Sequence, residues 1–224
     1  MDIPALLLTL RLALATTFLL LVVAVPLAWW IASGDGTRRA LVQAVVALPL
    51  VLPPTVLGFY LLVAMGPLSA PGRMVTRLLG HPLAFSFSGL LVGSLLYSLP
   101  FAVQPLVAGF SGVDRAYLEA AAGLGISPGR AFARIVLPLT RNSLLAAAIL
   151  TFTHTVGEFG VVLMLGGNIP GATRTLSIAL YDQVQEFDYV AANRTAGLLL
   201  VFALVALLAI YLVPGIRRRR DELV

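Results

Sequence analysis

Apolar residues come in long stretches along this chain, and polar residues gather in the short segments between them. Five stretches have close to the roughly 20 residues that a helix needs to cross a hydrocarbon core of about 30 Å. They cover residues 12–32, 41–65, 87–110, 143–165 and 195–213. The pattern therefore predicts an all-α integral membrane protein with about five transmembrane helices, in which residues 1–224 form one transmembrane domain.

Prolines interrupt several of these stretches. The second contains Pro49, Pro53 and Pro54, and the third contains Pro100 and Pro105. Proline removes a backbone donor and clashes with the preceding turn, so we expect kinked helices whose freed carbonyls are satisfied by neighbouring helices. Such kinks are typical of a packed helical bundle.

The first stretch is interpreted as a retained span and not as a cleaved signal peptide. It has no basic segment before it and is longer than a signal-peptide core of about 7–15 residues. Arg38 and Arg39 follow it directly, and positive charge resists export of that end.

Composition excludes several classes of function. Charged residues make up only 11% of the chain, against about a quarter in soluble domains. There is no cysteine, and all 15 basic residues are arginine. Because a P-loop needs a lysine to reach the β- and γ-phosphates, the chain has no complete Walker A site. Any ATP-driven function would therefore use an ATPase on another chain.

The high pI of about 10.2 reflects arginines that flank the apolar stretches and act as topology signals. No basic face is interleaved with aromatic residues as in proteins that bind single strands, so we expect no nucleic-acid partner. An N-terminus outside and a C-terminus inside would leave ten arginines inside and five outside, which favours that orientation. The inner ones are Arg38, Arg39, Arg115, Arg130, Arg134, Arg141, Arg217, Arg218, Arg219 and Arg220, and the outer ones are Arg11, Arg73, Arg77, Arg174 and Arg194.

The longest polar insert, residues 111–138, lies between the third and fourth predicted spans. It is expected to form two short helices at the membrane surface. Gly123 and Gly125 stand where the first should end, because glycine favours the left-handed turn after a helix. Ser127 and Pro128 then provide an N-cap and a proline at the first position of the second helix.

This insert carries a spaced motif: Glu-Ala-Ala, three residues, Gly, nine residues, Ile, one residue and Leu-Pro. The motif residues are Glu119, Ala120, Ala121, Gly125, Ile135, Leu137 and Pro138. Their spacing resembles the cytoplasmic signature of importer-type ABC transporter permeases, a family in which this loop contacts a separate ATP-hydrolysing subunit. The resemblance implies a type I importer permease fold and a coupling role for these residues. The alternative is a surface hairpin that only joins two spans.

Three further stretches resemble the permease subunits of bacterial molybdate importers: residues 48–58, 157–160 and 168–176. This resemblance implies a bacterial inner-membrane protein that works with a second copy of itself, two ABC ATPase subunits and a periplasmic molybdate-binding protein. ATP and Mg²⁺ would be bound by the ATPase, and this chain would hold no cofactor or metal. Sulfate, thiosulfate and tungstate permeases of the same family are the alternatives.

The fourth predicted span carries a polar stripe. Thr151, His154, Thr155 and Glu158 are spaced so that they share one helical face, and such a face usually borders the bundle or a watery cavity. The threonine hydroxyls either donate to a passing oxyanion or bond back to their own helix. A bare carboxylate repels a dianion, so we interpret Glu158 as structural, paired with an arginine or with backbone N–H groups.

Ser98 and Gln104 in the third span are weaker candidates for the substrate path, and Arg174 is placed to attract an anion near its entrance. A self-contained channel or secondary transporter remains an alternative, although such proteins usually show an internal repeat and none is visible. An intramembrane enzyme is disfavoured because no catalytic constellation occurs within the spans, and the chain is not expected to be an enzyme.

Overall fold

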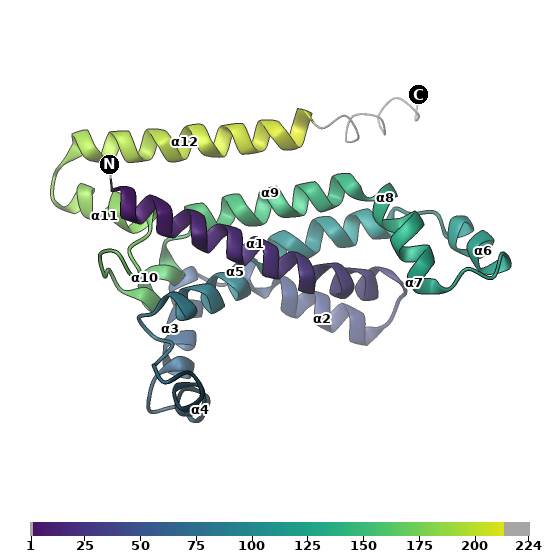
Figure 1. Cartoon of the computed structure of the whole chain (residues 1–224), viewed down its shortest axis with the longest axis horizontal. Coiled ribbons are helices and arrows are strands. Elements are labelled where there is room, and N and C mark those ends of the chain that lie inside the picture. The colour runs from purple at the N-terminus through teal and green to yellow at the C-terminus, as the bar shows by residue number, and fades with distance from the viewer. Residues whose placement is uncertain (1, 213–224) are drawn as a thin grey trace.

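A computed structural model describes residues 2–212 of the chain. Within those residues the chain is helical and contains no strand, which confirms the all-α prediction. Four long helices, α1 (Ile3–Ala32), α5 (Phe87–Ser111), α9 (Arg141–Gly157) and α12 (Tyr189–Leu212), run roughly along the long axis of the molecule (Figure 1). The short helices gather at its two ends.

The bundle is built on α1, α5 and α9, which pack on one another. Along α1 the buried positions recur every three or four residues, so one stripe of the helix faces its neighbours. Ala13, Ala24 and Ala28 in this stripe are fully buried, and such small residues let helices approach closely within a membrane. Helix α12 lies outside this core, against α9 and α11 (Leu176–Gln185).

Three of the described helices, α1, α5 and α12, are long and apolar enough to cross a membrane, and the number reaches five if two bent pairs each count as one span. The span ends differ from those expected. Helix α1 begins nine residues before the predicted residue 12, because the Asp2 side chain accepts a hydrogen bond from the Ala5 N–H and caps it. Arg11, expected at the outer rim, therefore lies within the helix, over the ring of Phe87 at 4.4 Å.

The second predicted span is two helices. Helix α2 (Thr37–Ala47) continues into a 3-10 turn (Leu48–Leu50), and α3 (Pro54–Met65) then leaves at a bend of 107°. The prolines of this segment account for the bend, which is far larger than a kink. An amphipathic helix not anticipated from the sequence, α4 (Ala70–Leu79), follows and packs on α3.

For the fourth predicted span, residues 143–165, the prediction of one continuous helix up to residue 165 is wrong. Helix α9 stops at Gly157, Glu158 is extended with ψ of 132°, and a separate short helix, α10 (Gly160–Gly166), follows. At 1.5 Å per residue, the 17 residues of α9 are about 26 Å long, slightly less than a hydrocarbon core. The break is sustained because the Ser177 hydroxyl donates to the carbonyl of Glu158.

The fifth predicted span begins six residues early. The Asp188 side chain accepts a hydrogen bond from the N–H of Ala191 at 3.0 Å and so caps α12 at its start. The predicted end at residue 213 and the arginine run 217–220 lie outside the described residues.

The hairpin between α5 and α9 contains α6 (Arg115–Gly123), α7 (Pro128–Ala131), a π-helical turn (Phe132–Val136) and α8 (Leu137–Leu139). It projects from one end of the bundle, and α10 and α11 lie at the other (Figure 1). The two short surface helices expected from the sequence are thus present.

Glycines bring α3 and α10 into close contact. A Cβ atom on Gly160 would lie 2.7 Å from Cβ of Pro54, and one on Gly58 would lie 2.8 Å from Cβ of Met164. Both distances are shorter than carbon atoms tolerate. Two of the stretches that resemble molybdate permeases, residues 48–58 and 157–160, therefore meet in space.

We expect Gly58→Ala to lower the thermal unfolding midpoint of the purified protein, because overpacking costs about 1–3 kcal/mol. Gly197→Ala is the matched control, since a Cβ at that helical glycine meets open space and alanine favours a helix by about 0.5–1 kcal/mol over glycine. Thermal melting in one detergent compares the two. Equal midpoints for both variants would contradict the α3–α10 packing.

Candidate functional site

The tip of the hairpin is held by backbone hydrogen bonds. Ile126 N–H donates to the carbonyl of Ala121, and Gly125 N–H donates to that of Ala122, each at 2.9 Å. This pair of bonds is a Schellman motif, which ends a helix with a residue in the left-handed region. Gly125 is that residue, with φ of +71°, whereas Gly123 is the last helical residue. The predicted glycine turn is confirmed at Gly125.

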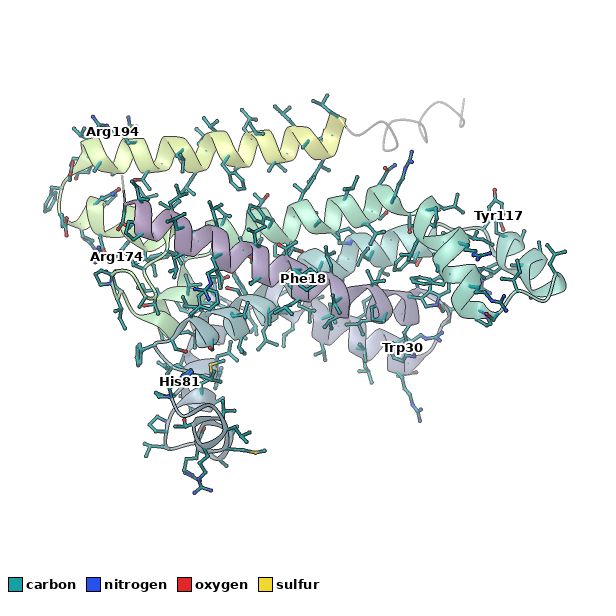
Figure 2. The ribbon with its side chains drawn as sticks, viewed as in Figure 1. Phe18, Trp30, His81, Tyr117, Arg174 and Arg194 are labelled. Atoms are coloured by element: carbon teal, nitrogen blue, oxygen red, sulfur yellow. The ribbon has the colours of Figure 1, made fainter. Side chains whose placement is uncertain are left out.

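The Glu-Ala-Ala residues lie on the first leg of the hairpin. Glu119, Ala120 and Gly125 are exposed, while Ala121 is buried beneath them. Two large apolar side chains beside them are also exposed, Tyr117 at 55% and Leu124 at 79%. Figure 2 shows Tyr117 at the end of the molecule that carries the hairpin. Away from the bundle, the hairpin thus exposes both small residues and these two large apolar side chains.

The second half of the motif lies on the return leg. Ile135 and Leu137 are half-buried, and Pro138 is exposed. Leu137 N–H donates to the carbonyl of Phe132, five residues back, which makes this turn π-helical. Pro138 has no N–H and its ring would crowd the carbonyl of Arg134 in an α-helix. The wider π turn accommodates the proline, so Pro138 shapes the return leg and does not merely end it.

Hydroxyl groups join α5 to the end of α9. Ser98 Oγ lies 2.9 Å from Nδ1 of His154 and 3.0 Å from Oγ1 of Thr155. Thr155 also bonds back to its own helix, donating to the carbonyl of Thr151 at 2.9 Å. The hydroxyl of Thr151 is buried and has no hydrogen-bond partner among the described residues. Thr151, His154 and Thr155 thus share one face of α9 as predicted, and the structure adds that Ser98 of α5 lies beside that face.

Glu158 is 4% exposed, and its partner differs from the one expected. Ser94 donates to its Oε2 at 2.8 Å, and Oε1 has no partner among the described residues. Neither an arginine nor a backbone N–H pairs with this carboxyl group among the described residues, so that part of the prediction is wrong. The reason is tertiary: Ser94, one turn before Ser98 on α5, faces the break between α9 and α10.

An open depression of about 640 Å³ lies beside this break. Phe101 stacks on the His154 ring, with centroids 3.9 Å apart, and Tyr97 packs on it at 4.9 Å. Thr55 and Thr153 line the same depression. Most of the lining is apolar, and its polar members are Thr55, Tyr97, Thr153, His154 and Glu158.

Two predicted path residues lie elsewhere. Gln104 is half-buried on α5 and does not line the depression. Arg174 lies at the end of the molecule opposite the hairpin (Figure 2). Its guanidinium forms ion pairs with Asp182 at 3.5 Å and Asp2 at 3.9 Å, and it donates a hydrogen bond to Asn168 at 2.6 Å. These contacts hold the loop before α11 against the start of α1, so the group is not free to attract an anion in this arrangement.

Sequence reasoning missed Ser94, Tyr97, Phe101 and Thr55. The spacing of Ser94 and Ser98, four residues apart, carries a signal for a shared helical face. No signal in the local sequence places Thr55 beside α9, because α3 reaches that position only through the 107° bend.

Comparison with known proteins identifies the class. A family model of the binding-protein-dependent transport system inner membrane component matches residues 24–221. The chain belongs to this family. It is accordingly a multi-pass protein of the bacterial inner membrane.

Curated relatives of this transport component match along most of its length. It is 51% identical over 211 residues to the molybdenum transport system permease protein ModB of Azotobacter vinelandii, covering 94% of this chain and 93% of that protein. It is 33% identical over 222 residues to ModB of Haemophilus influenzae, covering 99% and 96%. These relatives are named as permeases and not as enzymes.

Solved structures share its fold. One is a chain of a bacterial alginate ABC transporter, solved in complex with an alginate pentasaccharide-bound periplasmic protein. The match covers 97% of this chain and 78% of the transporter chain, with a TM-score of 0.74 at 18% identity. Another is a chain of the MetNI methionine ABC transporter in an inward-facing conformation. That match covers 93% of this chain and 92% of the transporter chain, with a TM-score of 0.71 at 17% identity. The type I importer permease fold expected from the hairpin motif is thus supported.

We expect Gly125→Ala to loosen the hairpin of the transport component, because a left-handed alanine costs about 1 kcal/mol, or roughly fivefold in local opening. Hydrogen–deuterium exchange of the Ile126 amide measures that opening. Gly123→Ala is the matched control, since Gly123 is helical and a Cβ there meets open space. Equal exchange in both variants would refute a conformational requirement at Gly125.

Proposed function

We propose that this chain is the membrane-spanning permease subunit of an ATP-driven molybdate importer, and that residues 1–224 form its transmembrane domain. The observation that carries the proposal is the 51% identity to a molybdenum permease over 94% of the chain. The contact between residues 48–58 and 157–160 supports it, because these stretches line one depression. No covalent chemistry is assigned to this chain.

The hairpin end faces the cytoplasm in this proposal, with the N-terminus outside and the C-terminus inside. In that orientation, six arginines of the described residues count as inner and four as outer, which follows the positive-inside rule. The six are Arg38, Arg39, Arg115, Arg130, Arg134 and Arg141, and the four are Arg73, Arg77, Arg174 and Arg194. Arg11 lies within α1 and is exposed along it, so it does not count toward either side.

The hairpin serves as the contact for a separate ATPase subunit. Its exposed small residues, such as Ala120, Gly123 and Gly125, let another backbone approach closely, and its Schellman turn gives the contact a defined shape. ATP and Mg²⁺ bind to that partner, because this chain has no lysine for a P-loop. Two permease chains and two ATPases form the working unit, and ATP-driven closure of the ATPases drives alternating access.

Molybdate passes along the depression beside α9, and a second copy of the chain closes its open side. Hydroxyl donors on its wall suit a tetrahedral dianion, and the Glu158 carboxyl group, which also lines the depression, is only 4% exposed and accepts a hydrogen bond from Ser94. Thr55 and Tyr97 line the depression directly. Thr151 is 0% exposed and does not line it. A periplasmic molybdate-binding protein delivers the ion at the α11 end.

Sulfate is the second candidate substrate. The sulfate transport system permease protein CysT of Escherichia coli is 30% identical over 184 residues, covering 82% of this chain and 66% of that protein. Tungstate, a tetrahedral dianion of similar size, shares the same requirements.

Proteoliposomes test the function. With the ATPase subunit and a molybdate-loaded binding protein, we expect ATP-dependent molybdate uptake, which disappears when the ATPase is omitted. Competition by tungstate and sulfate, each loaded on its own binding protein, ranks the substrates. Uptake that persists without an ATPase would show a channel or secondary transporter and would reject the proposal.

We expect Tyr97→Phe to reduce the rate of ATP-dependent molybdate uptake about tenfold, because a hydrogen bond to a charged acceptor contributes about 1.5–3 kcal/mol. Thr151→Val, which also deletes one hydroxyl, should leave uptake unchanged since that hydroxyl is buried away from the depression. Stopped-time uptake of labelled molybdate compares the variants. A loss with Thr151→Val and none with Tyr97→Phe would place the path elsewhere.

A further inference from the structure

Three aromatic rings meet where the hairpin joins the bundle. Trp29 and Phe132 have ring centroids 5.0 Å apart, Trp29 and Phe110 5.8 Å apart, and Phe110 and Phe132 5.7 Å apart. Each ring thus contacts both others, in the tilted and edge-to-face geometries that aromatic pairs prefer. We call these three residues the aromatic junction.

The three rings come from three separate elements. Trp29 lies in the last turn of α1, Phe110 in the last turn of α5, and Phe132 opens the π turn of the hairpin. They belong to the larger hydrophobic core at this end of the bundle, together with the fully buried Val136. The junction therefore joins the return leg of the hairpin to two long helices at once.

The first leg of the hairpin contacts the same core through Leu118, but among the described residues it contributes no aromatic ring to the junction. An open depression of about 590 Å³ separates much of α6 from the end of α1, with Trp29 and Phe110 on one side and Arg115 and Glu119 on the other. The covalent link from α5 to α6 is a short non-helical turn, residues 112–114. The ring-to-ring contact between the hairpin and α1 is thus made by the return leg.

The π turn sets the position of Phe132. The bond from Leu137 N–H to its carbonyl closes a ring one residue wider than in an α-helix. The extra residue rotates Phe132 relative to α8, and the ring faces Trp29. Pi-helical turns recur at functional sites in proteins, and here the turn follows from Pro138 of the hairpin motif.

We propose that the aromatic junction carries displacement of the hairpin to α1 and α5, so that Trp29 and Phe132 are positioning residues for coupling ATP hydrolysis to transport. This inference rests on the proposed function of the hairpin. A push on the exposed tip moves Phe132 as part of the return leg. Because the three rings are packed against one another, that movement displaces the ends of two spans and not of one.

Trp30 provides a matched control. It is adjacent to Trp29 on the same helix turn but is 41% exposed, and its ring contacts Arg39 at 5.5 Å instead of the junction. Figure 2 shows it at the same end of α1. A general effect of removing tryptophan from this depth of the membrane should appear equally at both positions.

The test measures molybdate taken up per ATP hydrolysed, in proteoliposomes containing the ATPase and the binding protein. We expect Trp29→Leu and Phe132→Leu to lower this ratio about fivefold, the scale of lost aromatic pair contacts, while the ATPase subunit still co-purifies. Trp30→Leu should keep the wild-type ratio, and Trp29→Phe, which retains a ring, should restore most of it.

Several outcomes would overturn the proposal. These are an unchanged ratio in Trp29→Leu and Phe132→Leu, an equal loss in Trp30→Leu, or loss of the ATPase subunit from the purified complex. Failure of both leucine variants and of Trp29→Phe to accumulate in the membrane would show a folding role instead. If the wild-type protein showed no ATPase-dependent molybdate uptake, the proposed function itself would be rejected. If the wild type coupled uptake to ATP hydrolysis and the leucine variants kept the same ratio, only the coupling role of the aromatic junction would be rejected.

Discussion

The structure depends on supplying hydrogen-bond partners wherever a helix breaks inside the membrane. Hydrocarbon offers no water to an unpaired carbonyl or amide, so a break is stable only where protein groups replace it. Hydroxyl side chains do this here. Ser177 donates to the carbonyl of Glu158, and Thr173 donates to that of Gly166 at 2.6 Å. Thr9, on α1, accepts from the N–H of Leu176 at 2.9 Å.

These bonds give the broken region its shape. With α9 stopped at Gly157, α10 turns against α3, and the glycines at 58 and 160 allow that contact. The polar groups exposed by the break then border a depression instead of lipid. In transporters, irregular backbone within the membrane is found where it lines such a cavity. In the proposed function, the depression beside this break is the path for the ion.

At the end of the bundle that carries the hairpin, the main constraint is that the hairpin be rigid. The Schellman turn at Gly125 and the π turn before Pro138 give the hairpin two defined corners. Three aromatic rings hold its return leg to the bundle. A short, well-packed element of this kind passes on a displacement that a flexible loop would absorb. Gly125 and Pro138 of the motif thus give the hairpin its shape, in addition to the contact with an ATPase that is proposed for the motif.

The sequence by itself determined the membrane class, the helical fold, the hairpin and its glycine turn at residue 125, because these follow from local apolar length, motif spacing and backbone preference. It also placed Thr151, His154 and Thr155 on one helical face. Only the tertiary structure decided that Ser94 pairs with Glu158, that α3 brings Thr55 beside α9, and that Arg174 is held by Asp2 and Asp182. The break at residue 158 depends on Ser177, nineteen residues away. Such contacts join residues far apart in the chain, and no local pattern encodes which distant hydroxyl or carboxylate will be near.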